Sequence, residues 1–191
     1  LSSVEKTEEK LFRSIENWKD IKSLKKVLSK KGTSAKIGGI SASGKAFFSH
    51  ALSRVLSEQK SHKQNLLYIA ANDFEARKIY EEFNSITNGA AVLVEPYEYM
   101  LYDAFAKSAD VEFRRMTAIN RLIKNDYSIA VTSPGAFMQY MTSPDKIKKC
   151  FLKVESGGIC EPYELADKLI SVGYERVSQV DGKGQFAMRG D

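Results

Sequence analysis

Residues 65–83 read NLLYIAANDFEARKIYEEF, and this stretch decides the fold class. Its first six residues are almost continuously apolar, which is typical of a strand buried on both faces of a parallel sheet. Asn72 or Asp73 can then cap a helix. The apolar residues of this helix recur at helical spacing: Phe74, Ile79, Tyr80 and Phe83. The stretch therefore predicts a buried strand that runs directly into an amphipathic helix.

The same alternation of short apolar runs and helical stretches continues on both sides of this unit. Further strands are expected at residues 36–40, 90–94 and 128–132, and further helices at residues 45–58, 111–123 and from Ser133. This order predicts an α/β fold in which a parallel sheet with right-handed crossovers is flanked by helices.

A basic segment precedes the sheet. The apolar residues of residues 4–31 recur at three- and four-residue steps, which predicts one amphipathic helix. Residues 1–31 hold nine lysines and arginines against five acidic residues, and so supply +4 of the net charge of +5. We expect this helix to pack on the body with a solvated basic face; a contact with nucleic acid is the alternative.

The pattern changes after Met141. Residues 142–145 are expected to form a turn-rich linker, residues 151–154 a strand and residues 162–172 a helix. Residues 174–180 and 185–189 are expected to form an antiparallel hairpin around a turn at residues 181–184. The predicted organisation has three parts: an N-terminal basic helix at 1–33, a parallel-sheet domain at 34–149, and the truncated beginning of a smaller α+β domain at 150–191.

Composition excludes several classes of protein. A chain of 191 residues with 43% hydrophobic content can bury a core, which argues against disorder, collagen and a disulfide-built mini-protein. Cys150, Cys160, His50 and His62 show no metal-ligand spacing, so we expect free thiols and no metal. Without an apolar run of about 18 residues, we expect no membrane contact and a cytoplasmic location.

Residues 39–46, GISASGKA, carry the sharpest chemical signal. They follow a predicted strand and open a predicted helix, as the phosphate-binding pattern GxxxxGK[ST] requires. The candidate anion-binding residues are Gly39, Ser43, Gly44 and Lys45. Ala46 departs from the pattern, because it lacks the hydroxyl that holds Mg²⁺ in working nucleotide hydrolases.

Two other parts of a nucleotide hydrolase are also missing from the sequence. No apolar strand ends in an Asp-Glu pair that could hold the metal, and no glutamine precedes the loop to bind adenine. We therefore assign no catalytic residue and expect no cofactor, although the loop could hold a phosphate or sulfate. The alternative interpretation is a tight strand-to-helix turn in which the glycines serve backbone conformation alone.

Further motifs are spread over residues 30–191. They are NDFEA at 72–76, EPYEYMLYDAF at 95–105, VTSPGA at 131–136, GYERVSQV at 173–180 and GQFAMRGD at 184–191. Together with the loop, they resemble the N-terminal region of bacterial transcription-repair coupling factors (Mfd), which is similar to UvrB. The resemblance implies a RecA-like, P-loop-like domain with a degenerate nucleotide-binding site.

Two departures favour the coupling factors over UvrB. UvrB resembles a working ATPase with an intact Gly-Lys-Thr, where this chain has Gly44, Lys45 and Ala46. UvrB also carries a long DNA-probing hairpin, and the stretch between Glu95 and Asp110 is too short for it. The resemblance therefore implies a module that is not itself an enzyme.

The resemblance also implies a function and a partner. It implies recruitment of UvrA to stalled RNA polymerase in transcription-coupled nucleotide excision repair, with UvrA contacted by Arg189, Arg176 and Phe186. RNA polymerase and duplex DNA would be bound by other domains of a parent ATP-dependent DNA translocase. Two alternatives stay open: a P-loop nucleotide- or phosphate-binding domain of a DNA helicase, and arginines that are ordinary surface charges.

Overall fold

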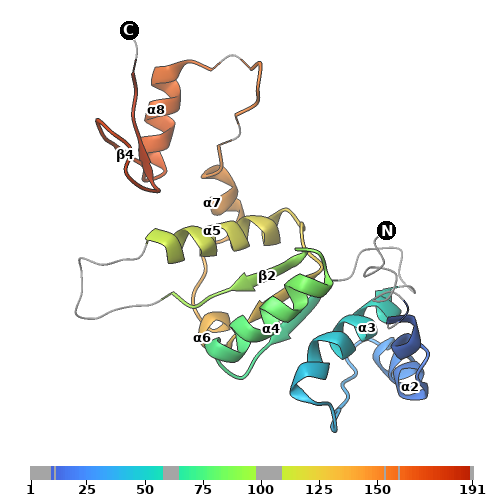
Figure 1. Cartoon of the computed structure of the whole chain (residues 1–191). Helices are drawn as coiled ribbons and strands as arrows, with labels where there is room; N and C mark the ends of the chain where they lie inside the picture. Colours follow the sequence, from blue (N-terminus) through green and yellow to red (C-terminus); the bar gives the residue numbers. More distant parts are fainter. Residues whose placement is uncertain are drawn as a thin grey trace.

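The computed structural model of the chain describes residues 10, 12–57, 65–97, 109–152, 154–158 and 160–189. Within these ranges, helices flank a small parallel sheet, and a second, smaller unit follows at the C-terminal end (Figure 1). The α/β prediction with a parallel sheet and flanking helices is confirmed.

Three strands form the sheet. They are β1 (Leu66–Ile69), β2 (Ala91–Val94) and β3 (Ile129–Thr132), in the order β1-β3-β2. All pairs are parallel, and the ladders align Leu66 and Ala91 with Ile129. All four residues of β3 are buried, as its central position and its nearly continuous apolar sequence require.

Helices cover the two faces of the sheet. On one face, α3 (Lys45–Ser57) and α4 (Asp73–Ile86) close the main core, where Phe83 and Val131 are fully buried. On the other face, α5 (Ala109–Ile123) packs Ala118 against Val92 and Val94 of β2. Among the described residues, none of the helices combines the length and the apolar character that a membrane crossing needs.

The prediction of a single helix over residues 4–31 is wrong within the described residues of this range. Residues 12–16 are helical, the chain turns at Asn17, and a second helix, α2 (Lys19–Leu28), follows. Trp18 has an extended ψ of 140° and is half exposed, so it does not continue the apolar stripe. The break lets Ile15 and Ile21 both enter a core with Ala51 and Val55 of α3.

Two predicted strands are also wrong. Residues 34–41 contain no strand, and Gly39 has a φ of +80°, which an extended ladder does not accommodate. The described residues of 151–154 are likewise outside any strand, while Lys153 lies outside the described residues. The linker region instead contains a short helix, α7 (Pro144–Lys149), after another, α6 (Pro134–Phe137), which Ser133 caps as predicted.

The C-terminal unit contains α8 (Pro162–Ser171), as expected, and two short strands, β4 (Glu175–Arg176) and β5 (Gln185–Phe186). The strands pair in parallel, so the antiparallel hairpin is wrong. The loop at residues 177–184 carries the chain back to the start of β4, so β5 runs in the same direction as β4. Gln185 Oε1 holds this loop by accepting the Asp181 and Gly182 N–H groups at 3.0 and 3.1 Å.

Candidate functional site

The predicted anion-binding loop lies at the start of α3 without a strand before it. Ser41 caps a 3-10 turn, η1 (Ala42–Gly44), and its Oγ accepts the Gly44 N–H at 3.2 Å. Ser43 Oγ lies 3.5 Å from Ser41 Oγ. One of the N–H groups that a phosphate would use is therefore already occupied within the loop. The expectation that the loop follows a strand of the sheet is wrong in this structure.

Lys45 and Ala46 point in different directions. Lys45 is exposed, and its amine makes no hydrogen bond or ion pair with any described residue. Ala46 is fully buried in the main core with Ala76 and Phe83. The hydroxyl of a serine or threonine at position 46 would therefore project from a backbone position that faces the core.

A cavity of about 280 Å³ lies between the loop, the end of β1 and α4. Its charged residues are Lys45, Lys78, Glu75 and Glu82, so two positive charges face two negative ones. Burial, and then the charges of Glu75 and Glu82, raise the pKa of Tyr68 above its usual value. The same carboxylates oppose the binding of a multiply charged phosphate next to Lys45.

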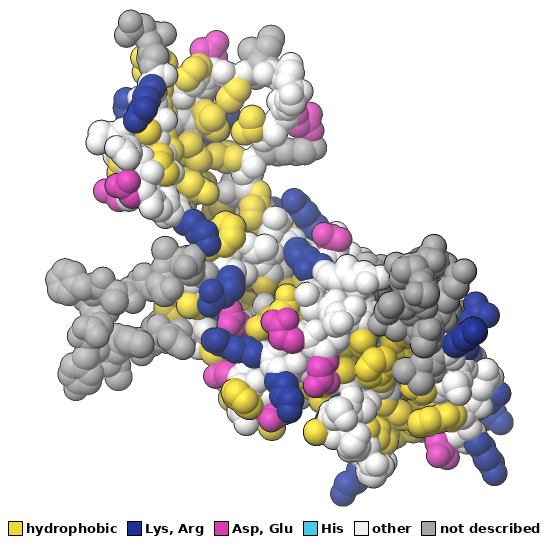
Figure 2. Space-filling view, viewed as in Figure 1, with side chains coloured by type: hydrophobic (Ala, Val, Ile, Leu, Met, Phe, Trp, Pro, Cys, Tyr) yellow, Lys and Arg dark blue, Asp and Glu magenta, His cyan; other side chains and the backbone are white. Residues whose placement is uncertain are grey.

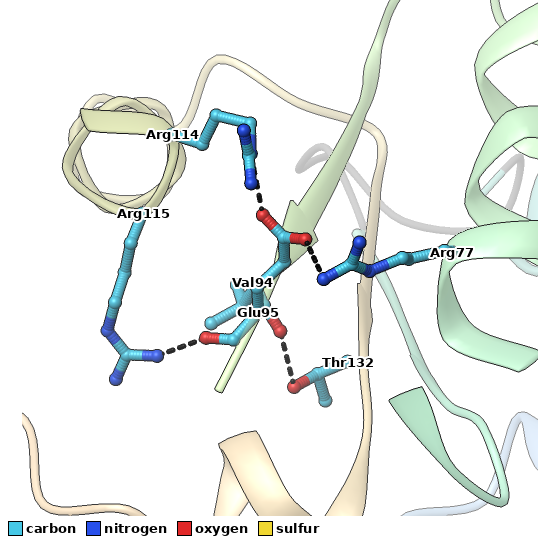
Figure 3. Close-up of polar contacts among 6 residues, drawn as sticks. All are labelled: Arg77, Val94, Glu95, Arg114, Arg115 and Thr132. Carbon is cyan, nitrogen blue, oxygen red and sulfur yellow. Dashed lines mark hydrogen bonds and ion pairs between the residues drawn. The ribbon is translucent and has the colours of Figure 1, made fainter. Parts of the chain in front are cut away.

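A second polar cluster lies at the end of β2. The Glu95 carboxylate is only 8% exposed, and its oxygens lie 3.0 Å from Arg77 Nη2 of α4 and 3.0 Å from Arg114 Nε of α5. Arg115, also on α5, donates to the Glu95 carbonyl, and Thr132 Oγ1 donates to the carbonyl of Val94 (Figure 3). The cluster joins both helix layers to the carboxyl end of the sheet.

Tyr97 continues this cluster beyond β2. The Gln139 amide accepts from the Tyr97 N–H at 2.6 Å and donates to the Tyr97 carbonyl at 2.9 Å, as a neighbouring strand would. The Tyr97 hydroxyl donates to Glu112 Oε1 at 2.9 Å. The other tyrosines of this motif, Tyr99 and Tyr102, lie outside the described residues.

The C-terminal strands bring two of the predicted partner-binding residues together. Arg176 of β4 and Phe186 of β5 are direct partners in the ladder. Arg176 is exposed, Phe186 is half-buried, and Arg189 is exposed in the segment after β5. The structure therefore places the aromatic Phe186 on the strand next to the exposed Arg176, with the exposed Arg189 three residues further along the chain.

Sequence reasoning missed the role of Glu95. Its position directly after a buried strand was the available signal, because polar residues at the carboxyl ends of parallel strands often meet those of neighbouring elements. The three arginines could not be assigned to it, since they come from two helices far apart in the sequence. Among the described residues, no three His, Cys, Asp or Glu side chains gather as a metal site requires.

No protein-family model matches this chain. The transcription-repair-coupling factor of Bacillus subtilis is 26% identical over 155 residues, covering 81% of this chain and 13% of that protein. The UvrABC system protein B of Thermotoga neapolitana is 24% identical over 167 residues, covering 80% of this chain and 24% of that protein. The corresponding protein of Fervidobacterium nodosum is 28% identical over the same length.

This chain is a homologue of both kinds of protein. The similarity confirms the resemblance to a UvrB-like region of transcription-repair coupling factors. The chain spans only 13% of the coupling factor and 24% of the UvrB protein that it matches. The comparison thus supports a UvrB-like module, while the domain limits and the roles of single residues remain predictions.

Proposed function

We propose that this chain is the UvrB-like module of a transcription-repair coupling factor, and that it recruits UvrA to stalled RNA polymerase in transcription-coupled nucleotide excision repair. The observation that carries this proposal is the similarity to two kinds of protein, each over about four fifths of the chain. A region shared by a coupling factor and by component B of the UvrABC system is well suited to meet another component of that system. Such a module would act in the cytoplasm.

The surface around β4 and β5 is the proposed contact with UvrA. Arginine presents a planar fork of donors that pairs with carboxylates, and an aromatic neighbour can anchor such a patch. Arg176 and Arg189 are exposed, and Phe186 is the ladder partner of Arg176. We infer that the complementary surface of UvrA is acidic and surrounds an apolar pocket.

Titration of UvrA with single variants tests this surface. Arg189→Ala and Arg176→Ala should each weaken binding by more than about 1 kcal/mol, or roughly fivefold, if they belong to the centre of the contact. Arg13→Ala provides the control, since Arg13 is exposed and precedes α2, the helix that lies at the other end of the molecule from β4 (Figure 1). Equal affinities for all three variants and the unmodified chain would refute the assignment.

The loop at Gly39–Lys45 supports a second, weaker candidate function, the binding of an anion. The exposed Lys45 and the left-handed Gly39 favour it, whereas the occupied Gly44 N–H and the nearby Glu75 disfavour nucleotide. We propose that the loop holds at most a phosphate or sulfate and that this chain does not hydrolyse ATP. Calorimetry with inorganic phosphate and with Mg-ATP tests both statements, and heat from millimolar Mg-ATP that Lys45→Ala abolishes would contradict them.

RNA polymerase binding and ATP-driven movement on duplex DNA are proposed for other domains of such a coupling factor.

The basic N-terminal segment leaves one competing function, direct DNA binding. Its signature would be duplex affinity that falls steeply with salt concentration. Measurement of that affinity at two salt concentrations, with and without residues 1–31, separates it from UvrA recruitment.

A further inference from the structure

One face of α2 consists mainly of lysine. Lys19, Lys22 and Lys26 follow one another at steps of three and four residues, which places them on the same face of the helix. All three are exposed, as is Ser23, which lies among them on this face. Asp20, the only acidic residue of α2, is turned about 100° away from Lys19 around the helix axis. We call the three lysines the lysine row.

The opposite face of α2 is buried against the body. Ile21 is fully buried in a core with Ala51 and Val55 of α3. Leu24 and Leu28 lie on the same side of the helix as Ile21, and both are half-buried. A helix that binds a membrane surface needs its apolar face for the lipid. The apolar face of α2 is already used within the protein, so the lysine row does not belong to such a helix.

Positive charge continues beyond the end of α2. Residues 19–31 hold six lysines against one aspartate and so carry a net charge of +5, and Lys30 and Lys31 are exposed directly after the helix. Figure 2 shows basic side chains around the end of the molecule at which α2 lies. At 1.5 Å per residue, the lysine row is about 10 Å long. A DNA duplex carries about six phosphate charges over that length of its axis.

We propose that the lysine row binds the phosphate backbone of duplex DNA without regard to base sequence. Lysine meets phosphate as a point charge. Arginine, with its planar fork of donors, is better suited to the carboxylates of a protein partner, and α2 contains no arginine. Lysine is also depleted in protein–protein interfaces. The choice of DNA over RNA rests on the proposed function in excision repair, and the test of DNA binding does not use UvrA.

DNA on the lysine row is compatible with UvrA on the C-terminal strands. The helix α2 lies at the other end of the molecule from β4, so the two surfaces can be occupied together (Figure 1). A module that binds both would hold UvrA close to the DNA. The two contacts should also fail separately: variants of the lysine row should keep their affinity for UvrA, and Arg189→Ala should keep its affinity for DNA.

Fluorescence anisotropy with a labelled duplex of mixed sequence, at several salt concentrations, tests the lysine row. The variant replaces all three of its lysines by glutamine. Each phosphate contact contributes about 0.9 to the slope of log affinity against log salt concentration, so the slope should decrease by roughly 2.7. Affinity at about 50 mM salt should fall at least tenfold. The matched control replaces three exposed lysines of α7 by glutamine and should change neither quantity: Lys146, Lys148 and Lys149.

Trp18 reports where the DNA lies. It is the only tryptophan of the chain, it is 52% exposed, and it directly precedes Lys19. DNA bound along the lysine row should therefore reduce the quenching of Trp18 by acrylamide at least twofold, at the same DNA concentrations that raise the anisotropy. Circular dichroism checks that both glutamine variants are folded, which substitutions of exposed side chains should leave unchanged.

Three results would overturn the proposal. Unchanged DNA affinity of the lysine-row variant, or no binding by the unmodified chain at low salt, would show that the row does not hold DNA. An equal loss in the α7 variant would show that net charge alone attracts the duplex. Tighter binding of polyglutamate, or of an RNA duplex of the same sequence, would assign the row to an acidic protein or to RNA instead.

Discussion

Replacement of Glu95 by glutamine tests the cluster that joins α4 and α5 at the end of β2. Glutamine has nearly the same shape, so the substitution removes the charge and leaves the packing in place. Arg77 and Arg114 then face a neutral amide, while Arg115 keeps its bond to the main-chain carbonyl of residue 95. The change in stability therefore measures the two ion pairs rather than a cavity.

The expected size follows from the exposure of the partners. Two charges 4 Å apart interact by about 4 kcal/mol in a protein-like dielectric and by about 1 kcal/mol in water. The side chains of Arg77 and Arg114 are 56% and 52% exposed, so each pair lies nearer to the water value. Desolvation of the buried carboxylate offsets part of the gain. We expect a loss of about 2 kcal/mol, which corresponds to a fall in Tm of about 4–8 °C for a chain of this length.

Urea and thermal unfolding provide the assay. Glu81→Gln is the matched control, because Glu81 is exposed on the same helix as Arg77 and has no ion pair with a described residue. The destabilisation by Glu95→Gln should shrink at high salt, since both guanidinium groups reach solvent. A loss below about 0.5 kcal/mol at low salt, the usual range for surface substitutions, would refute the assigned role of the cluster.

Three further predictions concern the core, a helix cap and acid stability. Phe83 is fully buried, so Phe83→Ala should cost about 3–5 kcal/mol in urea unfolding. Asn72 Oδ1 accepts the Glu75 N–H at 2.8 Å, and Asn72→Ala should cost about 1 kcal/mol, with Asn72→Asp retaining most of the stability in the same assay. Burial, and then the nearby charge of Arg54, lower the pKa of His50 from 6.5 to about 4. The unfolded chain therefore binds the proton more readily than the folded chain. The stability that neutral His50 contributes to the folded chain is complete above pH 6.5 and is lost as the pH falls towards 4. His50→Gln should remove that part of the pH dependence of the unfolding free energy.

The sequence by itself determined the strands of the sheet and the helices between them. Each of β1, β2 and β3 coincides with a short apolar run, and Asn72 and Ser133 cap their helices as expected. These features depend on local patterns, namely continuous burial, helical spacing and side chains that satisfy the first N–H groups of a helix. Sequence similarity then supplied the UvrB-like assignment.

Only the tertiary structure decided which segments pair and which side chains meet. Residues 36–40 have strand-like composition but form no strand, and β4 and β5 pair in parallel because the loop between them carries the chain back to its original direction. The Glu95 cluster unites arginines from two helices, and only the pairing of the strands shows that β3 is central among the three. Pairing and long-range ion pairs depend on contacts between distant residues, which a local pattern does not specify.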